Sequence, residues 1–170
     1  MSVKMAVTIG VLCWTIMAVD GFASTPIKSA EVDDSGVVHI TANGSQYEVP
    51  KEQGQTGVAQ LRICQDGRIA GWLVQYQSPA PNRELEKIAG LLILWRDGKV
   101  ACRIGTQQAV LEKWKLAEGS QKVVTLAGPT HGAGLHFELH RTSDCRLVAE
   151  FDELYKDVSK EPSWVRSLEH

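Results

Sequence analysis

The sequence predicts an all-β domain: two blade-like four-stranded antiparallel meanders packed as a sandwich, with an N-terminal hairpin and a short C-terminal helix or tail. Three observations lead to this prediction. Apolar and polar residues alternate with a period of two along much of the chain, tight turns containing glycine separate the alternating segments, and one strand–turn plan occurs twice. At 170 residues the chain is long enough for one domain with a substantial core.

Both ends of the chain are distinct from this domain. Residues 1–23 have the pattern of a signal peptide, because Lys4 precedes an apolar run that ends at small residues suited to a signal peptidase. An uncleaved anchor is the alternative. Residues 168–170 resemble the remnant of a purification tag. We therefore expect one β domain over residues 24–167, in a periplasmic or secreted protein without stable membrane insertion after cleavage.

The charge pattern indicates no nucleic-acid partner. The formal net charge is −2, and like charges never form a long run. Proteins that bind nucleic acid usually present a clearly basic surface or stripe. A protein or a component of the cell envelope is the expected partner.

The first expected element is a hairpin of residues 37–41 and 46–49. Asn43 and Gly44 lie between the two segments, and both residue types tolerate the positive φ angles of a tight turn. Residues 69–76 are apolar on both faces, which is typical of a strand covered on both sides. The further strands are expected at residues 58–64, 69–76, 91–96, 99–104, 113–117, 121–127, 135–141 and 146–151.

Two loops are candidate binding surfaces. Residues 77–89 contain two prolines and could include a helical turn from Asn82, and residues 128–134 are rich in glycine. Long loops on rigid sheets often carry binding residues, although either loop could equally be a connection without function. Residues 162–165 are expected to begin the short terminal helix.

The strand–turn plan repeats over residues 58–104 and 112–151. Each copy runs strand, acidic-Gly turn, strand, long loop, strand, turn, strand. A four-stranded meander of this length is the repeating unit expected of propeller blades and similar folds. The matching positions are Leu94, Arg96, Lys99 and Val100 in the first copy and Leu139, Arg141, Arg146 and Leu147 in the second.

The segment from Ile63 to Trp72, with Asp66-Gly67 at its centre, resembles the WD40-like repeat of TolB-type periplasmic propellers. The chain has Cys64-Gln65 where that motif has Ser-Pro. The resemblance implies a binding scaffold rather than an enzyme. Two repeats cannot close a propeller, so we expect two facing sheets, and the alternative is a partial propeller completed by oligomerisation.

One strand carries a possible metal site. His136, Glu138 and His140 alternate with apolar residues and therefore project to one face of the strand. Two imidazoles and a carboxylate are suitable ligands for Zn or Cu, and His131 in the preceding loop could supply a fourth. The alternative is a solvated strand face without metal, and we otherwise expect no cofactor.

Three cysteines remain after the signal segment, and an oxidising compartment favours one disulfide with one thiol left over. Strand alternation places Cys102 with Val100 and Ile104 as a buried core thiol. We therefore predict a Cys64–Cys145 disulfide. The alternative is that all three residues are free thiols.

No pattern of catalytic residues stands out. The chain lacks a Gly-x-Ser-x-Gly elbow and a phosphate-binding glycine loop, and Asp66 and Asp97 each precede glycine in an expected turn. The sequence thus favours a non-enzymatic exported β domain that binds a protein or cell-envelope partner through surface loops. A metal-binding protein using the His136–His140 face is the alternative.

Overall fold

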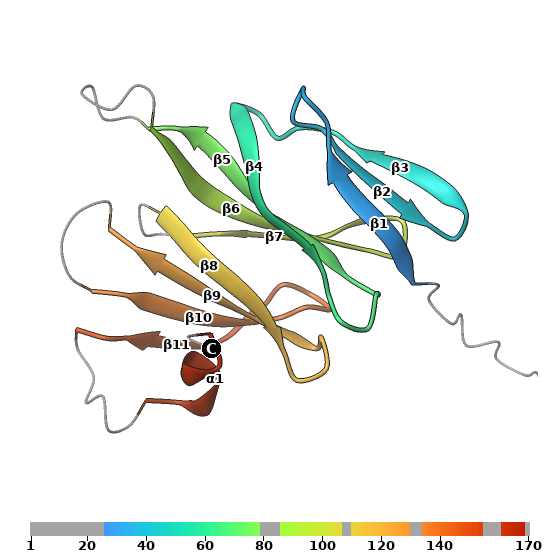
Figure 1. Ribbon diagram of the computed structural model, residues 1–170. Coiled ribbons are helices and arrows are strands. Elements are labelled where there is room, and N and C mark those ends of the chain that lie inside the picture. Colours follow the sequence, from blue (N-terminus) through green and yellow to red (C-terminus); the bar gives the residue numbers. More distant parts are fainter. Residues whose placement is uncertain (1–25, 79–85, 107–109, 130–133, 155–160, 169–170) are drawn as a thin grey trace, which may run out of the picture.

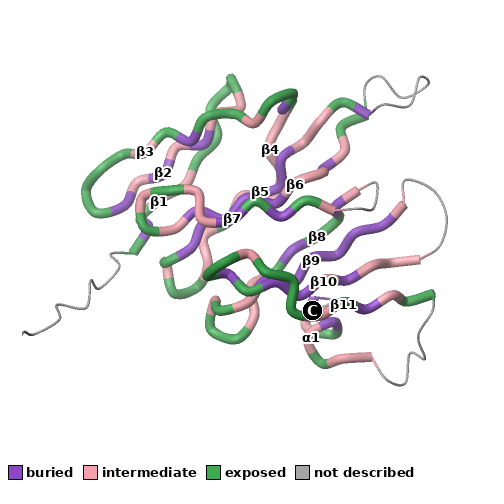
Figure 2. The backbone as a smooth tube through the Cα atoms, turned by 180° about the vertical axis from the view of Figure 1, so that it is seen from behind, coloured by how far each residue is buried: buried purple, intermediate pink, exposed green. Residues whose placement is uncertain are grey.

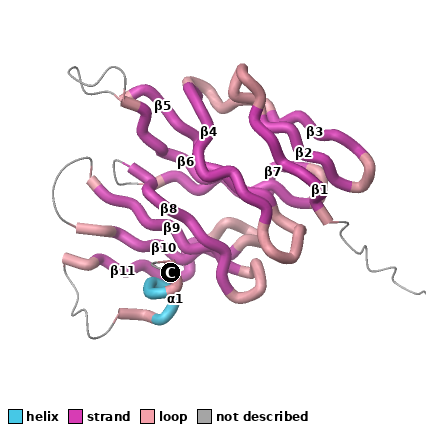
Figure 3. The backbone as a smooth tube through the Cα atoms, in the orientation of Figure 1, coloured by secondary structure: helices cyan, strands magenta, loops and turns pink. Residues whose placement is uncertain are grey.

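The computed structural model describes residues 26–78, 86–106, 110–129, 134–154 and 161–168. The regular elements of this part of the chain are strands, as predicted, apart from one helical turn near the C-terminus (Figure 3). The elements are β1 Ile27–Val32, β2 Val38–Ala42, β3 Ser45–Val49, β4 Gln55–Ile63, β5 Ala70–Gln77, β6 Lys87–Arg96, β7 Lys99–Gly105, β8 Val110–Ala117, β9 Lys122–Gly128, β10 His136–Arg141, β11 Leu147–Asp152 and α1 Ser163–Arg166.

The strands form three antiparallel sheets. Strands β4-β5-β6-β7 make one meander and β8-β9-β10-β11 make the other, each in sequence order, while β1-β2-β3 form a smaller third sheet. Each copy of the predicted repeat is therefore one sheet. The β4–β7 sheet lies between the other two, so the sandwich has a third sheet on one side (Figure 1).

The N-terminal sheet differs in two respects from the expected edge hairpin. The hairpin itself is present, with Asn43 and Gly44 at φ 56° and 70° in its turn. However, β1 adds a third strand, and this sheet covers a face of the β4–β7 sheet instead of extending its edge. The physical reason is burial: Trp72 and Trp95 on that face are 1% and 2% exposed because Ile27, Val38 and Ile40 cover them.

The central sheet is buried on both faces. Trp72 and Ile93 pack against the N-terminal sheet, whereas Leu73, Leu92 and Leu94 pack against the β8–β11 sheet. This confirms that the two-sided apolar pattern of residues 69–76 marks a covered strand. Figure 2 shows the resulting long buried stretches on β5 and β6.

The outer face of the β8–β11 sheet is covered by the C-terminal segment. Phe137, Leu139 and Phe151 pack there against Val165 of α1 and against Leu168. The helix begins after Pro162, as predicted. Leu168 is 8% exposed, so this residue of the expected tag remnant belongs to the folded body.

Several expectations concern residues outside the described ranges. These are the signal peptide, residues 1–23, and most of the two candidate binding loops: residues 79–85 of the first and 130–133 of the second. Residues 87–89, which could have been helical, instead begin β6. The described part of the chain contains no helix with the length and hydropathy needed to span a bilayer.

The predicted Cys64–Cys145 disulfide is wrong, because Cys145 pairs with Cys102. A register shift between Leu94 and Trp95 turns Val100 away, so Cys102 faces the second meander instead of sharing a face with Val100. There its Cα atom lies 5.5 Å from that of Cys145 in the β10–β11 turn. Among the described residues Cys64 is the free cysteine. The bond links β7 to the opposite sheet.

We predict that the double substitution Cys102→Ala and Cys145→Ala lowers the free energy of unfolding by about 4 kcal/mol, since the bond closes a loop with a sequence separation of 43. Denaturant unfolding with and without dithiothreitol measures the change. Reductant should destabilise the native protein and the Cys64→Ala control but leave the double variant unchanged. Loss of reductant sensitivity in Cys64→Ala would contradict the assigned pairing.

Candidate functional site

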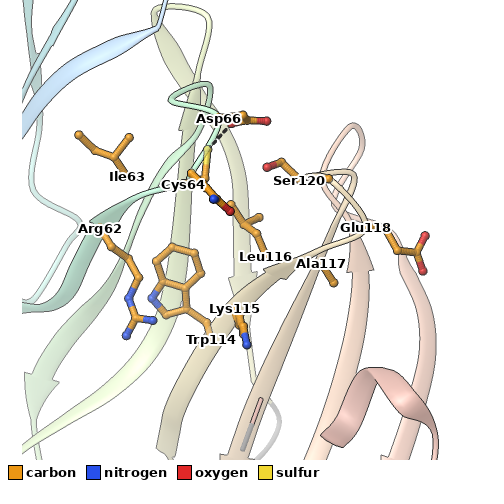
Figure 4. Close-up of a pocket in the computed structure, with 12 residues that line it drawn as sticks. Arg62, Ile63, Cys64, Asp66, Trp114, Lys115, Leu116, Ala117, Glu118 and Ser120 are labelled. Carbon is orange, nitrogen blue, oxygen red and sulfur yellow. Dashed lines mark hydrogen bonds between the residues drawn. The ribbon is translucent and has the colours of Figure 1, made fainter. Parts of the chain in front are cut away.

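A cleft of about 470 Å³ opens between the two meanders and is lined by residues 62–66 and 114–120. The first range comprises the end of β4 and the start of its turn, and the second comprises the end of β8 and the following turn. Figure 4 shows Arg62, Trp114 and Leu116 around the cleft, with Cys64 and Ser120 on opposite sides. A cleft of this size is large enough for a small molecule or a short peptide segment.

The cleft exists because β4 and β8 are both edge strands. Each is the first strand of its meander, and each pairs with one neighbour only. Gln60 has a positive φ of 52° and interrupts the register between Ala59 and Arg62. Its Nε2 donates to the carbonyl oxygen of Glu112, 2.6 Å away, and so connects the two edges at one point.

Trp114 forms part of the cleft wall. It is 2% exposed, and its indole Nε1–H has no hydrogen-bond partner within the described structure. The Arg62 guanidinium lies 5.3 Å from the centre of the ring, and Figure 4 shows the indole nitrogen on the side facing Arg62. Buried tryptophan N–H groups usually find an acceptor. This donor is therefore unmatched in a site next to a cation.

Arg62 is also weakly engaged. Its side chain is exposed, and its one hydrogen bond, to Gln60 Oε1, is 3.3 Å long. None of the ion pairs found among the described residues includes it. Within the described ranges, Arg62 and Trp114 thus present two donors with no anionic acceptor.

The turn after β4 supplies the upper wall. Cys64 Sγ donates to Asp66 Oδ1 at 2.6 Å and accepts from the backbone N–H of Ile69 at 3.0 Å. Burial raises the pKa of Asp66, but hydrogen bonds from Cys64, the Arg68 backbone and Ser120 hold that pKa below its usual value. Asp66 has the turn role that the sequence predicts, and Asp97 begins the β6–β7 turn at φ 52°.

A second hollow of about 300 Å³ continues from the cleft. The two share Asp66, Gly119 and Ser120. Arg68, Arg96 and Arg141 line the hollow, so the combined surface has five basic side chains, with Arg62 and Lys115, and two acidic ones, Asp66 and Glu118. Arg96, Arg141 and Glu118 each have a nearby ion-pair partner, Asp97, Asp144 and Lys122 respectively. The surface is basic although the whole chain is slightly acidic.

The predicted metal face lies inside the sandwich instead of facing solvent. His136, Glu138 and His140 pair in register with Ala127, Thr125 and Val123 of β9. Paired residues in an antiparallel sheet point to the same face. Val123 and Ala127 belong to the core between the two meanders, and the Glu138 side chain is 12% exposed. The alternative of a solvated strand face is therefore wrong.

These side chains form a continuous chain of polar contacts. Glu138 Oε2 lies 2.8 Å from His140 Nε2, and Glu138 Oε1 lies 3.2 Å from His136 Nε2. His136 Nδ1 contacts Asp152 Oδ1 at 2.5 Å, and His140 Nδ1 lies 3.2 Å from the carbonyl of Cys145. A carbonyl and a carboxylate both only accept, so a hydrogen on either ring nitrogen of His140 has an acceptor.

The contacts shift two pKa values in opposite directions. Burial lowers the pKa of His136, but the hydrogen bond and charge of Asp152, together with Glu138, raise it above 6.5 overall. The hydrogen bond from His140 lowers the pKa of Glu138 below 4.5, against the effect of burial. The carboxylate and the imidazolium therefore stabilise one another.

Metal binding at this face stays a prediction. Within the described ranges, no group of three or more His, Cys, Asp or Glu side chains is arranged to hold a metal ion. His131 lies outside those ranges. What the structure brings together is His136, Glu138 and His140, with Asp152 added from β11.

Sequence reasoning missed the cleft. Alternation of apolar and polar residues carries no information on which strand edges face each other. No model of a known protein family matches the chain, and no curated protein matches it either.

We predict that Gly71→Ala destabilises the protein by about 2 kcal/mol and disturbs the cleft wall. A methyl group there would lie 2.5 Å from Trp114 Cη2 and 2.9 Å from Leu94 Cδ2, so the rigid indole would have to move. Thermal unfolding and tryptophan fluorescence measure the change. Gly105→Ala is the matched control, because its methyl group meets only one atom, 3.9 Å away. Equal effects of the two substitutions would contradict this packing.

We predict that the free energy of unfolding decreases as pH rises above 6.5. The raised pKa of His136 gives stability that is complete below 6.5 and is lost as the folded protein deprotonates. The lowered pKa of Glu138 gives stability above 4.5 that is lost in acid. Denaturant unfolding between pH 2 and pH 9 measures the loss of stability in acid and the loss above pH 6.5.

The variant Asp152→Asn tests whether the Asp152 carboxylate causes the decrease in the free energy of unfolding above pH 6.5. It should cost about 1 kcal/mol at pH 5.5, a value reduced for the partial exposure of Asp152, and should flatten the decrease above pH 6.5. Asp34→Asn, at an exposed turn position, is the control and should keep the wild-type profile. An unchanged profile in Asp152→Asn would exclude this carboxylate as the cause.

Proposed function

We propose that this chain is an exported, non-enzymatic β domain that binds a protein partner of the cell envelope through the cleft between β4 and β8. The observation that carries the proposal is the unmatched indole Nε1–H of Trp114 beside the unpaired Arg62 guanidinium. A buried donor without an acceptor costs free energy, which a ligand that supplies the acceptor recovers. Export rests on the signal-like pattern of residues 1–23.

The surroundings of the cleft favour a macromolecular partner over a small molecule. The cleft is bordered by two strand edges and continues into the second hollow, so the whole surface is elongated. Strand edges offer backbone groups to an added extended segment. The loops at residues 77–89 and 128–134 would then be supplementary contacts.

We predict that a photo-crosslinking residue at Gln65, an exposed residue lining the cleft, forms a discrete crosslinked species in intact cells of the source organism. The same residue at Gln46, exposed on the N-terminal sheet, is the matched control and should form none. Mass spectrometry identifies the partner, and the purified partner must then bind the purified full-length protein. Equal crosslinking at both positions, or none at Gln65, would contradict the proposal.

A further inference from the structure

We infer that the cleft and the second hollow bind an acidic peptide segment, with one carboxylate held jointly by the Arg62 guanidinium and the Trp114 indole N–H. This inference rests on the proposed function and specifies the chemistry of the partner. Its starting point is the position of the Arg62 guanidinium carbon, 5.3 Å from the centre of the Trp114 ring whose N–H is unmatched. A carboxylate accepts several hydrogen bonds at once and neutralises the cation.

The Arg62 side chain lies beside the buried indole nitrogen. Nε1 is buried, whereas Arg62 is exposed and, among the described residues, makes one side-chain hydrogen bond, of 3.3 Å to Gln60. A rotation of this long side chain uncovers Nε1 and turns the guanidinium toward the same acceptor. A carboxylate then replaces a cation–π contact with two charge-assisted hydrogen bonds.

The charge of the surface selects an acidic segment over a single acid. Arg68, Arg96 and Arg141 line the hollow beyond the Asp66–Ser120 boundary. A segment that runs from the cleft into the hollow therefore meets a second basic group after the first carboxylate has bound. Ile63 and Leu116 are apolar members of the cleft wall, which suits apolar residues between the acidic ones.

The alternative ligands have weaker support. A neutral peptide would satisfy the indole N–H but leave the charge of Arg62 unmatched. A nucleic-acid strand would carry more negative charge than this surface balances, because two of its five basic residues, Arg96 and Arg141, already have ion-pair partners. The test therefore includes a neutral peptide and a nucleic-acid strand, and tighter binding of either would count against the acidic peptide.

The test compares two probes on the purified full-length protein. One is an N-acetylated, C-amidated pentapeptide in which leucine alternates with aspartate and glutamate, and the other replaces the acids with asparagine and glutamine. Calorimetry measures affinity, and the ¹H–¹⁵N signal of the Trp114 indole, assigned with Trp114→Phe, reports the site. We expect the acidic peptide to shift this signal saturably and to bind at least tenfold more tightly than the neutral peptide.

Substitutions test whether Arg62 contributes to the affinity for the acidic peptide. Arg62→Gln should weaken the acidic peptide at least tenfold, because it removes a charged donor. Arg103→Gln is the control: this residue pairs with Glu52 outside both hollows and should leave affinity unchanged. Thermal unfolding confirms that each variant is folded. A short single-stranded oligonucleotide serves as the third probe and should bind more weakly than the acidic peptide.

The inference is overturned if both peptides bind equally, if the oligonucleotide binds more tightly than the acidic peptide, if neither peptide binds, or if binding leaves the Trp114 signal unmoved. A crosslink at Gln65 combined with failure of the acidic peptide would retain the proposed function and reject only the acidic chemistry. Binding of the acidic peptide without any crosslink in cells would retain the acidic chemistry of the site and reject the proposed partner in the cell envelope.

Discussion

Burial of both faces of the β4–β7 sheet is the constraint on which the other features depend. Trp72 and Trp95 require cover on one face, and Leu73 and Leu94 require it on the other. The N-terminal sheet and the second meander provide that cover, so neither is an optional addition. The outer strands of this sheet, β4 and β7, are edges whose backbone groups stay available to meet neighbours. The cleft follows from this arrangement.

The two meanders are fastened at one edge and open at the other. β4 and β7 are the outer strands of the central sheet. The Cys102–Cys145 bond holds the β7 side against the second meander. On the β4 side the contacts are non-covalent and include the hydrogen bond from Gln60 to Glu112 and the contact of Arg62 with Trp114. Because the disulfide holds the sheets together at β7, the cleft between β4 and β8 can stay open without separation of the sheets. The free thiol Cys64 lies on that open side.

The sequence predicted the fold better than the site, for physical reasons. Period-two alternation and the Asn43-Gly44 turn are local signals, and the two meanders follow from them. Cysteine pairing is not local: a register shift at Leu94 and Trp95 redirected Cys102, and bulges leave little trace in a sequence. The facing of β4 and β8 depends on how whole sheets pack, which alternation does not encode. The inward direction of Glu138 was missed for the same reason.

The two groups of polar residues between the meanders differ in whether they are satisfied. Around Glu138, an imidazole N–H on any of the four ring nitrogens of His136 and His140 has an acceptor close by. Trp114 Nε1 has none, and Glu161 Oε1, the other unpartnered buried side-chain atom in the described structure, adjoins residues outside it. The buried N–H donors of β10 thus have acceptors, whereas the buried N–H donor of Trp114 in β8 has none within the described structure. The unmatched Trp114 donor beside Arg62 is therefore the observation on which the proposed ligand rests.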